Sequence, residues 1–285
     1  MHARHTLVSF FGLGSATAAP LLYTYIKEHP QVGLTEVDTN FFSDAKIFAK
    51  GLDWYENHFA KGEGISLYGE LASNYLASTQ SAGLIARTYP NAKLFAIIEN
   101  PLVSVRVDYV EARRSGKINA KTSLAMFLKL HPEVLLRAAY GRQLAHYFSY
   151  YSPNDFLVLL AADVRKKPLE SIKAVYTHLE LETTFVPSSL RHLVPIEIDD
   201  TKKKPGLIKR FVLLIKRGVK FFYTKLRGVV KPPEVPIETA SVIARKIPLS
   251  PELEKFLKDY YRKDVKQLNS LLHRNVESEW GFDDE

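Results

Sequence analysis

Small residues gather where an apolar run ends near the start of the chain, in residues 7–22. Backbone N–H groups freed at a helix N-terminus point at one spot, the helix dipole adds positive potential there, and small side chains let an anion come close. The stretch therefore predicts a strand, an anion-binding turn and a helix that reaches Glu28. The residues that would form the turn and contact the anion are Gly12, Gly14, Ser15, Ala16 and Thr17.

The turn lacks two groups that phosphate loops usually carry, a lysine and a hydroxyl at the helix start. Ser15 stands where the lysine is expected, and Ala18 stands where the hydroxyl is expected. Backbone groups alone would therefore have to hold the anion.

The same turn also fits dinucleotide binding. A G-x-G-x-x-(G/A) turn, followed about 20 residues later by an acid that holds a ribose hydroxyl, is the dinucleotide fingerprint. Residues 12–17 match it except at the last position, and Glu36 or Asp38 supplies the acid. An NAD(P)-binding oxidoreductase is therefore an alternative function.

Apolar runs alternate with helical patterns along the rest of the first 180 residues. The runs in 92–101 and 154–163 predict buried strands, because they are continuous rather than alternating. Apolar strands separated by helices at this spacing are typical of a parallel sheet covered on both faces. The expected helices cover 106–114, 123–129, 135–150, 170–179 and 252–272.

Composition limits the class of protein. At 285 residues and 46% hydrophobic content, the chain can bury the core of one large α/β domain, with or without an appendage. The absence of cysteine excludes disulfides and thiolate chemistry, and the nine histidines show no metal-ligand spacing, so we expect no metal. No apolar run approaches the roughly 20 residues of a membrane span, and no signal peptide precedes the first strand, so we expect a cytoplasmic protein.

The net charge of +8 is concentrated in residues 202–231, which hold eleven Lys or Arg and no Asp or Glu. Apolar residues recur there at helical steps, as in an amphipathic basic helix. The segment predicts contact with an anionic membrane surface, which would make the protein peripheral there, or with a polyanion; packing on its own domain is the alternative. The rest of the chain sums to about −3, so we expect no nucleic-acid partner.

A set of motifs follows one another in a characteristic order from about Val8 to Trp280. They are Gly12 with His29-Pro30, Phe41-Phe42, Trp54-Tyr55, Gly69-Glu70 with Tyr75, Asn100-Pro101 with Asp108-Tyr109, and Arg245-Lys246-Ile247-Pro248 before a last helix. In order and spacing they resemble the sulfotransferase family, specifically its heparan-sulfate-type branch and bacterial relatives. The resemblance implies a three-layer, P-loop-type α/β domain with a central, mainly parallel sheet. It also implies transfer of a sulfuryl group from 3′-phosphoadenylyl sulfate (PAPS) to a hydroxyl or amine acceptor, such as a carbohydrate.

The resemblance also assigns roles to single positions. Asp38 stands where the family has its catalytic glutamate, so it is the expected base. The turn residues and Arg245, in a segment that clasps the nucleotide in the family, are the expected cofactor contacts. Arg106, one residue from the lost serine of the 3′-phosphate motif, is the expected compensating contact.

The chain departs from the family pattern at the donor-binding positions. Leu71 replaces the lysine of the G-E-K motif, and Glu99, Ser104 and Val107 replace two arginines and the serine of the 3′-phosphate motif. Each lost charge-assisted contact costs about 1.5–3 kcal/mol. Two functions therefore stay open within the resemblance: a PAPS-dependent sulfotransferase, and a non-catalytic sulfotransferase-like binding protein.

The expected organisation has three parts. Residues 1–200 form the α/β core, 201–235 form a basic amphipathic insertion, and 236–285 form a C-terminal loop and helix that complete the same domain.

Overall fold

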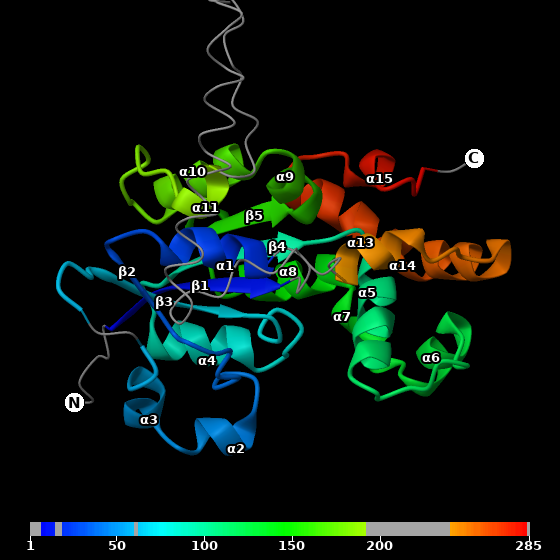
Figure 1. Ribbon diagram of the computed structural model, residues 1–285, viewed down its shortest axis with the longest axis horizontal. Coiled ribbons are helices and arrows are strands. Elements are labelled where there is room, and N and C mark those ends of the chain that lie inside the picture. Colours follow the sequence, from blue (N-terminus) through cyan, green and yellow to red (C-terminus); the bar gives the residue numbers. More distant parts are fainter. Residues whose placement is uncertain (1–6, 15–18, 60–61, 192–239, 284–285) are drawn as a thin grey trace, which may run out of the picture. The chain divides into compact units, whose positions relative to one another are not determined.

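A five-stranded parallel sheet forms the centre of the protein (Figure 1). The computed structural model describes residues 7–14, 19–59, 62–191 and 240–283, and all of these belong to one compact unit. The strands lie in the order β2-β3-β1-β4-β5, and every neighbouring pair is parallel. Their bounds are β1 Val8–Gly14, β2 Val32–Leu34, β3 Leu67–Ala72, β4 Lys93–Ile98 and β5 Phe156–Leu160.

Helices cover both faces of the sheet. On one face, α1 and α10 pack on side chains such as Phe10 and Phe95; on the other, α4 and α8 pack on Phe11 and Leu94. The α/β sheet with surrounding helices is confirmed. The helices are α1 Ala19–Lys27, α2 Ala45–Phe48, α3 Leu52–Glu56, α4 Ser81–Thr88, α5 Pro101–Arg114, α6 Leu124–Leu130, α7 Glu133–Arg137, α8 Tyr140–Phe148, η1 Pro153–Asp155, α9 Ala161–Lys166, α10 Pro168–His178, α11 Ser188–Arg191, α13 Ala240–Lys246, α14 Pro251–Leu272 and α15 Val276–Glu279.

Helix α5 starts where β4 ends, and its start is fixed by the sequence. The Asn100 side chain accepts a hydrogen bond from Leu102 N at 2.9 Å, and Pro101 occupies the first turn, where no N–H is needed. This cap places Ser104 and Asp108 one and two turns into the helix, near the carboxyl end of the sheet.

The C-terminal helices pack on the same unit. Ala244 of α13 packs against Val103 and Val107 of α5. Helix α14 crosses α8 so closely that a Cβ on Gly141 would lie 2.2 Å from the carbonyl oxygen of Asp264, so a glycine is required there.

Two predicted elements differ from the structure. The helix expected over 135–150 is interrupted between α7 and α8, and at the break Gln143 Nε2 donates to the carbonyls of Leu136 and Arg137 at 2.7 and 3.2 Å. The strand expected over 154–163 is shorter, since η1 precedes it and α9 begins at Ala161.

The predicted basic insertion at 201–235, with its charged stretch 202–231, lies outside the described residues. Within the described part of the chain, no helix is both long enough and apolar enough to cross a membrane.

Candidate functional site

A cavity of about 150 Å³ opens where the carboxyl ends of β1 and β3 meet α5, α7 and α8. Ligands of open parallel sheets bind at this edge, because the loops that follow the strands converge there. The cavity is lined by Gly14, Ser73, Asn74, Leu76, Ala77, Ser104, Asp108, Arg137, Tyr140 and Gln143.

Gly14 ends β1 at this edge with a positive φ of 108°. A Cβ there would lie 2.4 Å from the carbonyl oxygen of Ile97, its partner on β4, so only glycine fits. Gly12 has a different reason to be glycine, since a Cβ there would lie 2.1 Å from a Leu71 side-chain atom inside the core. Ser15, Ala16 and Thr17 lie outside the described residues.

Asp38 lies in the loop after β2 and is tied to the cavity through Ser73. Its Oδ2 accepts hydrogen bonds from Ser73 N at 2.9 Å and Ser73 Oγ at 2.8 Å, and its Oδ1 accepts one from Asn40 N at 3.2 Å. The carboxylate is half-buried and held in one orientation. Asp38 does not line the cavity itself, but it is hydrogen-bonded to Ser73, which does.

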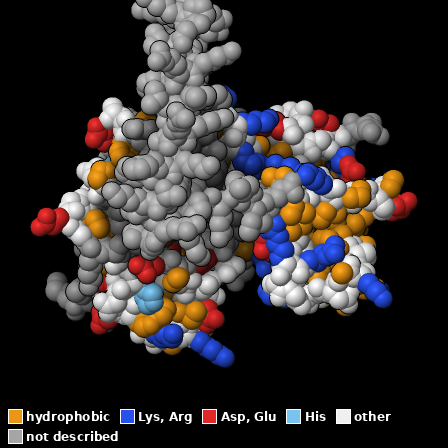
Figure 2. Space-filling view, viewed as in Figure 1, with side chains coloured by type: hydrophobic (Ala, Val, Ile, Leu, Met, Phe, Trp, Pro, Cys, Tyr) orange, Lys and Arg blue, Asp and Glu red, His pale blue; other side chains and the backbone are white. Residues whose placement is uncertain are grey.

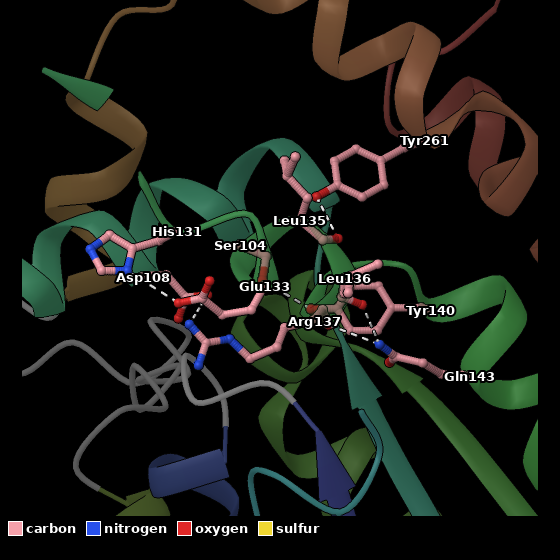
Figure 3. Close-up of polar contacts among 10 residues, drawn as sticks. All are labelled: Ser104, Asp108, His131, Glu133, Leu135, Leu136, Arg137, Tyr140, Gln143 and Tyr261. Carbon is pink, nitrogen blue, oxygen red and sulfur yellow. Dashed lines mark hydrogen bonds and ion pairs between the residues drawn. The ribbon is translucent and has the colours of Figure 1, made fainter. Parts of the chain in front are cut away.

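The far wall of the cavity is a polar network (Figure 3). The Tyr140 hydroxyl donates to Ser104 Oγ at 3.1 Å, and burial raises the pKa of that tyrosine, which keeps it a neutral donor. Beside it, Arg137 Nη2 lies 3.2 Å from Asp108 Oδ2. Burial raises the pKa of Asp108, and the Arg137 charge opposes that rise. The wall therefore offers a hydroxyl pair and an ion pair to a polar ligand.

A second charged cluster surrounds Glu99, the residue that follows β4. The Glu99 side chain is only 3% exposed, yet its Oε2 lies 2.9 Å from Arg245 Nη2 and 2.8 Å from Arg165 Nη1. Arg245 donates a hydrogen bond, whereas the Arg165 contact is an ion pair without hydrogen-bond geometry. Burial, together with the charge of Arg165, lowers the pKa of Arg245, and Glu99 opposes this.

Arg106 makes hydrogen bonds to the main chain. Its Nε donates to the Leu102 carbonyl at 2.7 Å, and its Nη1 donates to the Ile247 carbonyl at 3.0 Å. Burial lowers its pKa, and the nearby charge of Arg245 contributes to the drop. Arg106 thus fastens the segment after α13 to α5.

The residues expected from the sequence therefore form two groups. Gly14 lines the cavity and Asp38 lies behind Ser73. Arg106 and Arg245 belong instead to the cluster around Glu99 and the segment after α13. Figure 2 shows basic side chains beside hydrophobic ones over α13 and the start of α14.

Sequence reasoning missed Ser73, Arg137 and Arg165. Ser73 directly follows β3, so the rule that places ligands after parallel strands could have found it. Arg137 and Arg165 lie on short helices, and no local pattern indicated their ion pairs with Asp108 and Glu99. Within the described ranges, no three His, Cys, Asp or Glu residues are grouped as metal ligands would be.

Solved structures of sulfotransferases share the architecture of this chain. No protein family model matches the chain. The chain is 23% identical over 281 residues to human bifunctional heparan sulfate N-deacetylase/N-sulfotransferase 1, a match that covers 90% of this chain and 28% of that protein's length. A sulfotransferase from Alicyclobacillus acidocaldarius superposes with a TM-score of 0.69 at 18% identity, over 96% of this chain and 98% of its own. A mouse sulfotransferase in complex with PAP superposes with a TM-score of 0.55 at 11% identity, over 97% and 89% of the two chains.

Proposed function

Because this chain has the sulfotransferase fold, we propose that it brings a sulfuryl donor and a hydroxyl- or amine-bearing acceptor together at the carboxyl edge of its sheet. One observation carries the proposal. Gly14 and Ser104 line a single cavity with Ser73, and Ser73 holds Asp38. An anion-binding turn and a carboxylate base are the two groups that such a transfer needs close together.

In the proposed reaction, the acceptor oxygen or nitrogen forms a bond to the donor sulfur as the bond from sulfur to the donor phosphate breaks. The acceptor proton passes to Asp38, and the donor leaves as a nucleotide phosphate. Ser73 orients the Asp38 carboxylate, while Gly14 brings the end of β1 to the cavity in which the transferred group would lie.

The sulfuryl donor of the proposal is of the PAPS class, since the mouse protein is complexed with PAP. The described residues fit this donor in part. The start of α1 follows the end of β1 within a few residues, and a helix N-terminus favours an anion such as a phosphate. The buried carboxylate of Glu99 does not suit a phosphate bound beside Arg245, because it repels one.

A carbohydrate is the proposed acceptor class. The human relative is named for heparan sulfate, and the cavity wall presents Ser104, Tyr140 and the Arg137 and Asp108 pair, which can bond sugar hydroxyls. Contact of residues 202–231 with an anionic membrane or polyanion, and a location in the cytoplasm, are further proposals from the sequence.

A non-catalytic sulfotransferase-like binding protein is the second candidate. The observation that favours it is the Glu99 ion pair, which already occupies a cation expected to hold the donor. The NAD(P)-binding alternative explains only the first 40 residues, and Asp38, one of its two candidate acids, is bonded to Ser73.

The test combines binding with turnover. Titration calorimetry with PAP and with NAD should show binding of PAP at micromolar concentrations and none of NAD. Transfer from ³⁵S-labelled PAPS to a desulfated heparan acceptor should fall at least about 100-fold in Asp38→Asn, because a positioned base contributes about that much. The matched control is Asp53→Asn, an exposed carboxylate in α3, which should leave transfer unchanged.

The outcomes separate the candidates. PAP binding without transfer in the wild type supports the binding protein, and NAD binding without PAP binding supports the oxidoreductase. Transfer that is equal in Asp38→Asn and wild type would remove Asp38 from the proposed mechanism.

A further inference from the structure

Two arginine side chains contact the buried carboxylate of Glu99. It is 3% exposed, its Oε2 faces Arg245 and Arg165, and its Oε1 accepts a hydrogen bond from Asn100 N at 3.0 Å. Both oxygens are therefore engaged. A buried carboxylate persists only when such partners compensate its lost hydration.

The cluster lies at the edge of the sheet that the proposed site uses. Glu99 is the first residue after β4, two positions beyond Ile97, which pairs with Gly14. Its cationic partners come from α9 and α13, which are distant in sequence and both reach this carboxylate. The Glu99 main chain also lies beside the Tyr140 hydroxyl, a member of the cavity wall.

Guanidinium groups recognise carboxylates and phosphates through the same planar fork of N–H donors. Two arginines from separate elements that converge on one point form an anion site, and here the anion belongs to the chain itself. Arg106 does not offer its guanidinium to this site in the same way, because two of its nitrogens already donate to main-chain carbonyls.

We propose that Glu99 is a specificity-determining residue that fills this anion site from within, so that a phosphate on the ribose 3′ position adds no affinity to the donor nucleotide. The inference rests on the proposed function. A 3′-phosphate brought to Arg245 and Arg165 meets the Glu99 charge at contact distance and has to displace it. A nucleotide whose only phosphate is at the 5′ position meets no such charge.

The experiment compares two nucleotides that differ only in the 3′-phosphate, AMP and PAP (3′-phosphoadenosine 5′-phosphate). Titration calorimetry on the full chain should show that the wild type binds AMP at least as tightly as PAP. Glu99→Gln, which keeps the shape and removes the charge, should bind PAP about 10- to 100-fold more tightly than the wild type and leave AMP binding within about threefold. Glu99→Asp, which keeps the carboxylate, should retain the wild-type preference.

The matched control is Glu180→Gln. Glu180 also forms an ion pair with a residue of β4, since its Oε1 lies 2.6 Å from Lys93 Nζ. Lys93 is at the amino end of that strand, however, and the Glu180 side chain is exposed to solvent. The same change of charge there should leave the ratio of the two affinities unchanged. Sodium sulfate gives a second readout, since the vacated site in Glu99→Gln should bind sulfate and raise the melting temperature of that variant more than that of the wild type.

Three outcomes decide the matter. A wild type that binds PAP at least tenfold more tightly than AMP overturns the inference and leaves the proposed function standing. Unchanged PAP affinity in a folded Glu99→Gln variant also overturns it. Failure of both nucleotides to bind either the wild type or Glu99→Gln overturns the proposed function, and the inference with it. The comparison of AMP with PAP on the wild type needs no variant, so the inference is testable even if Glu99→Gln does not fold.

Discussion

Two buried carboxylates, Glu70 in β3 and Glu99 after β4, are stabilised in opposite ways. Glu70 is fully buried and accepts hydrogen bonds only from neutral groups: Thr39 N at 2.8 Å, Thr39 Oγ1 at 2.7 Å, Tyr55 OH at 2.8 Å and Tyr75 OH at 2.9 Å. Glu99 is nearly as buried, but its partners include two arginines. Neutral donors fix a loop in place, whereas cations at a sheet edge also attract a ligand.

The two carboxylates therefore differ in their proposed roles: Glu70 supports a loop, and Glu99 decides which nucleotide is favoured. Glu70 holds Thr39, the neighbour of Asp38, against β3, so it positions the loop that carries the proposed base. Glu99 holds side chains that could otherwise bind an anion. The resemblance to the sulfotransferase motifs covers both positions, and it predicts that Glu99 stands where that family has an arginine, whereas Glu70 keeps the family's glutamate.

The largest expected effect is the loss of stability in Glu70→Ala. That change leaves two buried tyrosine hydroxyls and the Thr39 donors without an acceptor, so we expect a loss of at least about 3 kcal/mol in the free energy of unfolding. Urea denaturation measures it. Glu99→Gln should lose less, because Arg165 and Arg245 are 22% and 39% exposed and water can hydrate them. Equal losses in the two variants would contradict the comparison.

Most of the fold, but less of the site, could be predicted from the sequence. The fold was predictable because β1, β4 and β5 are continuous apolar runs, and Asn100-Pro101 marks a helix start. The sulfotransferase resemblance, based on motif order, is confirmed at the level of fold. The helix break before α8 was not predictable, since it depends on Gln143 bonding to two carbonyls.

The candidate site was less predictable than the fold. Gly14 could be placed from the strand that it ends, and its required positive φ agrees with a turn there. The pairing of Glu99 with Arg245 joins residues 146 positions apart, and no local pattern encodes it. The roles of Ser15, Ala16 and Thr17 stay predictions.

The pH dependence of stability gives a second test of the role assigned to Glu70. Burial raises the pKa of Glu70 above its usual value of 4.5, despite the hydrogen bonds that oppose the rise. The folded protein therefore holds this proton more tightly than the unfolded chain does. Its contribution to stability is complete below about pH 4.5 and is lost as the pH rises through the folded pKa.

Glu70→Gln removes the titrating group and supplies the reference for this test. The free energy of unfolding of the wild type minus that of Glu70→Gln should fall as the pH is raised from 4 toward 8, measured by urea denaturation at each pH. The difference isolates Glu70 from the other groups that titrate in this range. A difference that stays flat or rises with pH would show that the four hydrogen bonds outweigh burial.

The smallest expected change in stability, and the one that best sharpens the division between support and selectivity, belongs to Ser73→Ala. The hydroxyl of Ser73 donates one of the two bonds that orient Asp38 Oδ2, and the backbone N–H keeps the other. Because Ser73 is near the surface, we expect a loss of only about 0.5–1 kcal/mol in the free energy of unfolding. Sulfuryl transfer should fall more than this, about tenfold in kcat, since the proposed base loses its fixed orientation.

Binding of AMP and PAP by Ser73→Ala should keep the wild-type ratio, because Ser73 makes no contact with Glu99 or its arginines. A changed nucleotide ratio, with kcat unaltered, would place Ser73 with the selectivity residues and undo the division between the two regions.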